Sequence, residues 1–118
     1  MAGATPQNAT TLLGSSVTIA ANGSHSIEFD SGQCYFFELW ADLSTDASAT
    51  DGVEAKVKRK TGAGGSAAVN GMGMSWDVNE SALKYLGLHS PGTVEISFEN
   101  KDGSYDATLT QVYARVAS

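Results

Sequence analysis

The sequence has 118 residues, of which 13 are acidic and 7 are basic, for a formal net charge of −6. This length suits one domain that buries about two-thirds of its unfolded surface, and the charge disfavours nucleic acid and anionic membranes as partners. A single cysteine excludes an internal disulfide, and no apolar stretch approaches the ~20 residues that a membrane-spanning helix needs.

Residues 1–11 predict a flexible N-terminal arm. They are small and polar and include Pro6, so they offer little apolar surface to bury. They also lack a basic region followed by an apolar core, so we expect the chain to fold in the cytoplasm of the cell that makes it rather than to be secreted. Residues 12–118 are then expected to form a single domain without internal repeats.

Two short apolar runs after the arm predict a β-hairpin. Val17 and Ile19 alternate with polar residues, and residues 26–29 alternate in the same way. This is the period of a strand with one buried face. Asn22 and Gly23 lie between the runs, and both residue types accept the positive φ of a tight turn.

Residues 33–42, QCYFFELWAD, carry large apolar side chains on both faces of the strand that they predict. Successive side chains of a strand point to opposite faces. One face would hold Tyr35, Phe37, Leu39 and Ala41, and the other Cys34, Phe36, Glu38 and Trp40. Such a strand needs a packed layer on each side or a partner chain on one side. We therefore predict an oligomer or partner interface that includes Phe36, Trp40, Tyr35 and Phe37.

The middle of the chain predicts two more strands around a glycine-rich loop. Residues 53–58 alternate apolar and charged side chains, and residues 72–78 have apolar side chains at every second position. Residues 61–68, TGAGGSAA, have too many glycines for a strand and predict a loop. Four of the seven basic residues lie between 56 and 60, which we interpret as a solvated strand face.

Residues 79–87 permit a short helix, because Asn79 could cap it and Ala82, Leu83 and Leu86 share a helical face. An extended conformation from residue 85 to residue 88 is the alternative. Further on, residues 94–98 alternate as a strand. In the last strand, the apolar side chains lie at odd positions up to Leu109 and at even positions from Val112 onward. This change of parity predicts a bulge near Thr110 or packed layers on both faces of the second half.

The overall pattern predicts an all-β protein, an antiparallel β-sandwich of jelly-roll type with about seven or eight strands. No pattern specifies a reaction. His25 and His89 lie beside turn residues, and residues 73–77 match a nucleophile elbow only until Asp77 replaces its second glycine. The histidines and the cysteine are too scattered for zinc, and the acidic loop residues fit no regular calcium spacing. We therefore predict a non-enzymatic protein without catalytic residues, metal or cofactor.

The aromatic residues allow a different kind of binding. Trp40, Trp76 and Tyr85 could stack on sugar rings, since a flat apolar face beside polar groups suits a pyranose. For Trp40 we expect packing in a core or an interface rather than sugar binding, because its strand is so apolar. A carbohydrate-binding module on a virion fibre or a cell surface is therefore the alternative function.

The small polar arm, the sandwich-like strands between residues 17 and 116 and the missing catalytic constellation together resemble the capsid decoration, or cement, proteins of tailed bacteriophages. The resemblance concerns these general features over the whole chain and includes no diagnostic motif. It implies a virion structural protein that associates as a homotrimer and clamps the major capsid protein or another virion protein. It also implies a role for the surplus apolar surface at Phe36 and Trp40.

Overall fold

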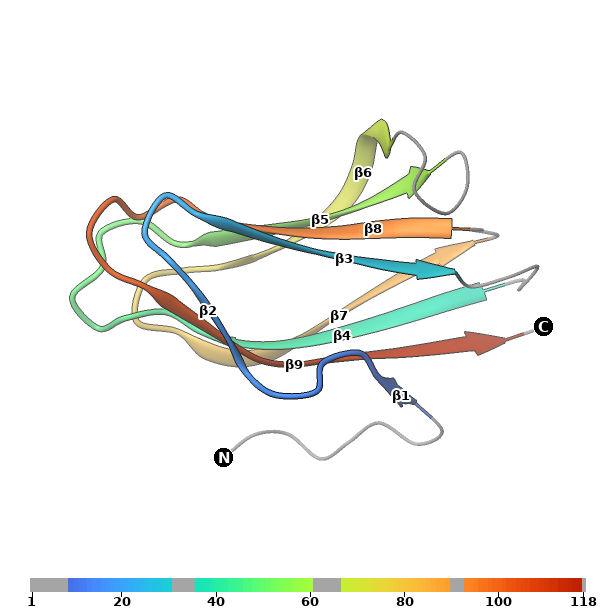
Figure 1. Ribbon diagram of the computed structural model, residues 1–118, viewed down its shortest axis with the longest axis horizontal. Coiled ribbons are helices and arrows are strands. Elements are labelled where there is room, and N and C mark those ends of the chain that lie inside the picture. The colour runs from blue at the N-terminus through green and yellow to red at the C-terminus, as the bar shows by residue number, and fades with distance from the viewer. Residues whose placement is uncertain (1–8, 31–35, 61–66, 90–92, 118) are drawn as a thin grey trace.

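Two antiparallel β-sheets packed face to face form the described part of the chain (Figure 1). The computed structural model describes residues 9–30, 36–60, 67–89 and 93–117, and these residues form nine strands and no helix. None of them therefore belongs to a helix that could cross a membrane. The strands are β1 (Thr10–Thr11), β2 (Val17–Ile19), β3 (Ser24–Asp30), β4 (Phe36–Ser44), β5 (Val53–Lys60), β6 (Ala67–Trp76), β7 (Ser81–His89), β8 (Thr93–Asn100) and β9 (Ala107–Ala117).

The strand order confirms the predicted sandwich and its jelly-roll character. The five-stranded sheet has the order β1-β9-β4-β7, with β2 also paired to β9, and the four-stranded sheet has the order β3-β8-β5-β6. From β2 onward, each strand lies in the sheet opposite its predecessor, except for β6 after β5. This is the double Greek-key connection of a jelly roll. Of the predicted arm, residues 1–8 lie outside the described residues, and Thr10–Thr11 form β1 along β9.

The helix that residues 79–87 permitted does not form. Ser81–His89 is strand β7, paired with β4 along its whole length. Asn79 has a φ of 53° and lies in the turn before this strand rather than at a helix N-terminus. Without β7, β4 would be the edge strand of its sheet, and the backbone groups along that edge would lack the partners that they need. This long-range pairing outweighs the local helical spacing.

The predicted change of parity in the last strand is a bulge at Thr110. β9 pairs Gln111 with Asp42 but Leu109 with Leu43, so Thr110 is the extra residue. Because of the bulge, the apolar side chains of both halves of the strand face the core. Leu109 and, on the opposite parity, Val112 are both fully buried.

The core lies between the sheets and is built from alternate residues of the long strands. The predicted inward set of β5 is buried, and so is that of β8. The predicted turn at Asn22 and Gly23 forms: Asn22 has a φ of 57°, and the Gly23 N–H donates to the Ala20 carbonyl at 2.8 Å. The β-hairpin predicted around it is wrong, because β2 pairs with β9 and β3 pairs with β8 in the opposite sheet, so the turn carries the chain from one sheet to the other. The largest fully buried side chains are Trp76, Phe37, Phe98, Ile19, Leu39, Leu43, Ile96, Leu109, Val53, Val57, Val94 and Val112.

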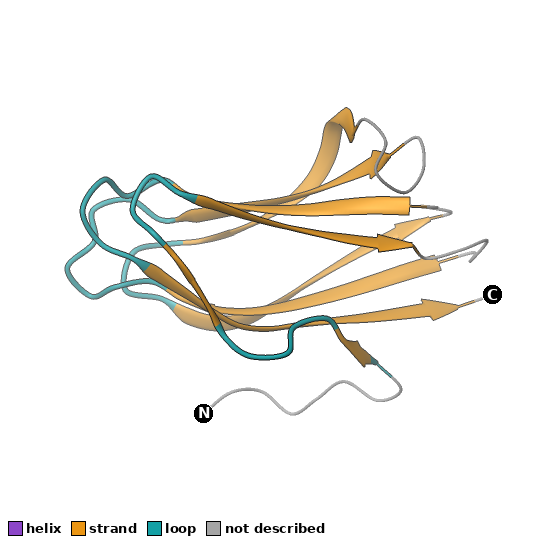
Figure 2. Ribbon diagram, viewed as in Figure 1, coloured by secondary structure: helices purple, strands orange, loops and turns teal. Residues whose placement is uncertain are grey.

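A buried carboxylate ties together the loops at one end of the sandwich, where several connections gather (Figure 2). Asp102 Oδ1 accepts the N–H groups of Thr50 (2.8 Å) and Asp51 (3.1 Å). Its Oδ2 accepts those of Ser104 (2.9 Å) and Tyr105 (2.7 Å). These hydrogen bonds, that of Ser104 foremost, hold the pKa of Asp102 well below its usual range. The β4–β5 and β8–β9 loops are thereby joined through one side chain.

Candidate functional site

The outer face of the four-stranded sheet is charged. Lys60 Nζ lies 2.6 Å from Glu28 Oε2 and 3.9 Å from Glu95 Oε1, and Lys56 Nζ lies 3.4 Å from Glu54 Oε1. Lys60 thus pairs with carboxylates of β3 and β8, and Lys56 pairs with a carboxylate of its own strand, β5. The Lys56 side chain is 52% exposed, as expected of a solvated face, whereas the Lys60 side chain is only 10% exposed between its two carboxylates.

The outer face of the five-stranded sheet is aromatic. β4 is its central strand there, and it turns Phe37, Leu39 and Ala41 into the core. The alternate side chains therefore face outward, where the register places Trp40 opposite Tyr85 of β7 and Glu38 opposite Arg115 of β9. We call the group that meets on this face the aromatic cluster; it consists of Phe36, Glu38, Trp40, Tyr85 and Arg115.

Trp40 is flanked within the cluster from both neighbouring strands. The Arg115 guanidinium carbon lies 5.1 Å from the centre of the Trp40 ring, in a cation–π contact. From the other side, the Tyr85 ring lies 5.2 Å away at an interplanar angle of 53°, a tilted aromatic pair. The two neighbours limit the open area of the Trp40 ring for stacking against a sugar.

Glu38 connects the two flanking residues. Its Oε1 accepts a hydrogen bond from Arg115 Nε at 2.7 Å, and its Oε2 accepts one from the Tyr85 hydroxyl at 2.9 Å. Burial alone would raise the pKa of Glu38, but the hydrogen bonds from Arg115 and Tyr85 outweigh it and lower that pKa. Burial and the carboxylate of Glu38 raise the pKa of Tyr85. At neutral pH the cluster is therefore preassembled, with Glu38 charged and Tyr85 protonated.

Gly87 makes room for the cluster on β7. A Cβ atom at this position would lie 2.5 Å from Phe36 Cζ and 2.9 Å from the Tyr85 hydroxyl oxygen. The Phe36 ring thus lies against the backbone of β7, where any larger residue would displace it. Gly87, Glu38 and Arg115 were not among the site residues predicted from the sequence. Glu38 had one signal, because it is the single charged residue on an otherwise apolar strand face.

The sequence-predicted site residues divide between this face and the core. Tyr85 is 48% exposed, and Phe36 and Trp40 are half-buried. Phe37 is 0% exposed and stacks on Phe29 at 5.4 Å, so the structure corrects its proposed place in an interface. Tyr35 lies outside the described residues.

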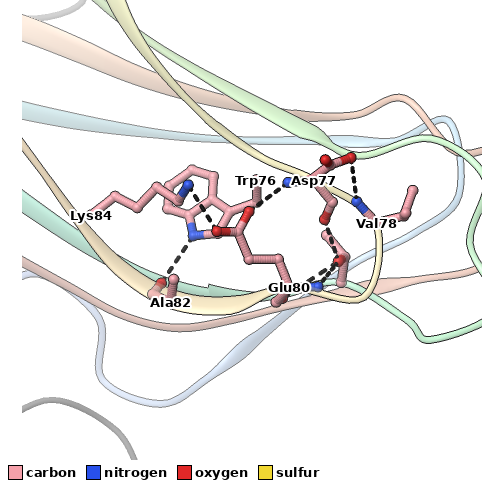
Figure 3. A network of polar contacts seen from close by, with 7 residues as sticks. Trp76, Asp77, Val78, Glu80, Ala82 and Lys84 are labelled. Carbon is pink, nitrogen blue, oxygen red and sulfur yellow. Dashed lines mark hydrogen bonds and ion pairs between the residues drawn. The ribbon is translucent and has the colours of Figure 1, made fainter.

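Trp76 is also a core residue, which corrects its proposed sugar-stacking role. Its exposed fraction is 1%, and its indole Nε1 donates to the Ala82 carbonyl at 2.9 Å (Figure 3). Lys84 Nζ lies 5.9 Å from the centre of the ring. The ring thus has a hydrogen-bond partner and cover within its own chain, as expected of a buried tryptophan.

An open groove of about 760 Å³ lies near Trp76, beside the β6–β7 turn. The polar groups on the turn side of the groove bind one another (Figure 3): Glu80 Oε1 accepts the Asp77 N–H at 2.7 Å, and Glu80 Oε2 pairs with Lys84 Nζ at 3.0 Å. Thr45 Oγ1 donates to the Asp77 carbonyl at 2.7 Å. These groups hold the β6–β7 turn in place, so the groove is a weaker candidate for a binding site than the aromatic cluster.

The described residues form neither of the catalytic and metal-binding arrangements considered for the sequence. Residues 73–76 belong to the regular strand β6, where Ser75 pairs with Glu54 of β5, rather than to the sharp turn of a nucleophile elbow. No group of three His, Cys, Asp or Glu side chains converges within the described ranges.

The sequence matches no protein-family model and no curated protein. Several solved structures share the fold. The enzymatically active domain of tailspike protein 4 from bacteriophage CBA120 aligns with a TM-score of 0.64 and 15% identity, over 86% of this chain and 15% of that chain. A family 16 carbohydrate-binding module aligns with a TM-score of 0.53 and 11% identity, over 85% and 72%. PRD1 vertex protein P5 aligns with a TM-score of 0.52 and 10% identity, over 86% and 87%. At these identities the likeness concerns the fold alone, and the chain spans only a small part of the tailspike chain.

Proposed function

We propose that this chain is a non-enzymatic structural protein of a virion, of the capsid decoration or cement type, that binds protein through its aromatic cluster. The observation that carries the proposal is the gathering of Trp40, Tyr85 and Arg115 on one outer sheet face. Tryptophan, tyrosine and arginine are the residue types that most often dominate the energy of protein interfaces. Their mutual contacts hold them in place before binding, which lowers the entropy cost of association.

In this proposal the chain is made in the host cytoplasm and ends in the virion, where it stabilises the protein shell as a homotrimer. Its partners are other copies of itself and the major capsid protein or another virion protein. The occurrence of the same fold in a bacteriophage tailspike protein and in a vertex protein supports this class of role. A net charge of −6 supports the exclusion of nucleic acid and membrane as partners.

The proposal predicts that the chain is detected by mass spectrometry in purified particles of the virus that encodes it. We expect Trp40→Ala to weaken binding of the added protein to particles that lack it by at least about tenfold, as for an interface hot spot. Tyr105→Ala is the matched control, because Tyr105 is also an exposed aromatic residue but lies in the β8–β9 loop. Particles that never contain the chain would contradict the proposal, and so would equal losses for the two variants.

Carbohydrate binding is the second candidate, because Tyr85 is exposed beside a carboxylate and a tryptophan and because a carbohydrate-binding module shares the fold. Tryptophan fluorescence separates the candidates. Trp76 is buried, so the Trp40→Phe variant should show blue emission that acrylamide quenches weakly, whereas Trp76→Phe should leave the more accessible indole of Trp40. Under the structural proposal we expect no spectral shift of the wild type on a glycan panel. A saturable shift that Tyr85→Ala abolishes would favour carbohydrate binding instead.

A further inference from the structure

We infer that the occupant of the aromatic cluster is the same sheet face of a second copy of this chain. The inference rests on the proposed function and names its first partner: the copies associate with each other through the outer face of the five-stranded sheet. Other surfaces of the assembly then contact the shell protein, and Trp40→Ala weakens binding to particles because it weakens the assembly.

The first argument concerns charge. Each copy carries a net charge of −6, so two copies repel one another at long range and can meet only where few charges are unbalanced. On the aromatic face, Glu38 and Arg115 neutralise each other at 2.6 Å, and the next carboxylate along β4, Asp42, is only 5% exposed. The strands of the opposite sheet are less suitable, because they hold more carboxylates than cations, namely Glu28, Asp30, Glu54, Glu95 and Glu99 against Lys56, Lys58, Arg59 and Lys60.

The second argument concerns self-complementarity. An interface between identical copies needs a surface that carries both halves of each contact. Glu38 and Arg115 are a directly opposed pair on neighbouring strands, so a two-fold axis can bring Arg115 of each copy toward Glu38 of the other. Around a three-fold axis the same two charges can alternate from copy to copy. In either arrangement, the exposed parts of Phe36, Trp40 and Tyr85 supply the apolar contact area between the copies.

Light scattering of the wild-type protein at micromolar concentration should give a mass two or three times the 12.2 kDa of the chain. Glu38→Arg gives the face two cations, and Arg115→Glu gives it two carboxylates. Each variant alone should self-associate with an affinity at least about tenfold lower than that of the wild type, because like charges then meet across the contact. An equimolar mixture of the two variants should associate again.

The double variant Glu38→Arg/Arg115→Glu controls for folding, because it restores an ion pair within each chain, and we expect it to fold and self-associate. Circular dichroism melting of all variants identifies any that do not fold. A monomeric wild type would overturn the inference, as would a mixture that stays monomeric when both of its variants are folded. If the monomer still binds purified particles, the proposed role in the virion stands, and the homotrimer and this inference fail. If the protein self-associates but is absent from particles, this inference stands and the proposed role in the virion fails.

Discussion

Phe37→Ala should lower the free energy of unfolding by about 3–5 kcal/mol, the range for deleting a buried aromatic side chain. Phe37 is fully buried and stacks on Phe29 between the two sheets, so the smaller side chain leaves a cavity that rigid neighbours fill poorly. A domain of this size has a total stability of roughly 5–15 kcal/mol, so the variant should be marginal. Urea unfolding followed by circular dichroism measures the loss.

The adjacent variant, Phe36→Ala, is the matched control for this prediction. It removes the same side chain from the same strand but from the outer face, where Phe36 is only half-buried. We expect less than half of the stability loss of Phe37→Ala, together with weaker self-association. Equal losses for the two variants would contradict the orientation of β4 described here.

Asp102→Asn should lower the melting temperature substantially, on the order of 10 °C for a domain of this size. The carboxylate accepts four backbone N–H groups from two loops, and an amide must turn its own N–H donors toward some of them. Asp46→Asn is the control from one of these loops, because Asp46 is exposed and its side chain accepts the nearby Ser48 N–H at 2.8 Å. Its melting temperature should remain within a few degrees of the wild type. Similar losses for both variants would show that Asp102 does not join the loops as described.

The same carboxylate makes stability depend on pH in a defined direction. Its pKa is lowered in the folded protein from about 3.9 in an unfolded chain, so the unfolded state takes up a proton first as the pH falls. The contribution of Asp102 is therefore complete above about pH 5 and declines below about pH 4, toward the folded-state pKa. Melting curves from pH 6 to pH 2 should show a smaller acid-induced loss for Asp102→Asn than for wild type. Parallel curves for the two proteins would contradict this assignment.

Much of the fold follows from local sequence patterns. The alternation in residues 53–58 and 94–98 predicts strands with one buried face, and the structure confirms both as β5 and β8. Asn22 and Gly23 predict the first turn, although not the sheets that its two strands join. The parity change near Thr110 predicts a bulge or cover on both sides, and the structure has the bulge. These features could be predicted because a period of two and a positive φ are properties of neighbouring residues. Residues 79–87 could not be assigned in this way, since their spacing suits a helix as well as a strand and only the pairing with β4 decides.

The sequence by itself determined that the strand around residues 36–40 is apolar on both faces, but only the tertiary structure decided which face is buried. The alternation separates Phe37 from Phe36 and Trp40 without ranking the two sides. The choice depends on which strands flank β4 and on which side the four-stranded sheet packs. The same holds for the aromatic cluster, because Glu38 meets Arg115 across 77 positions and Tyr85 across 47. No local periodicity encodes such contacts; they arise when the jelly-roll order places β7 and β9 on either side of β4.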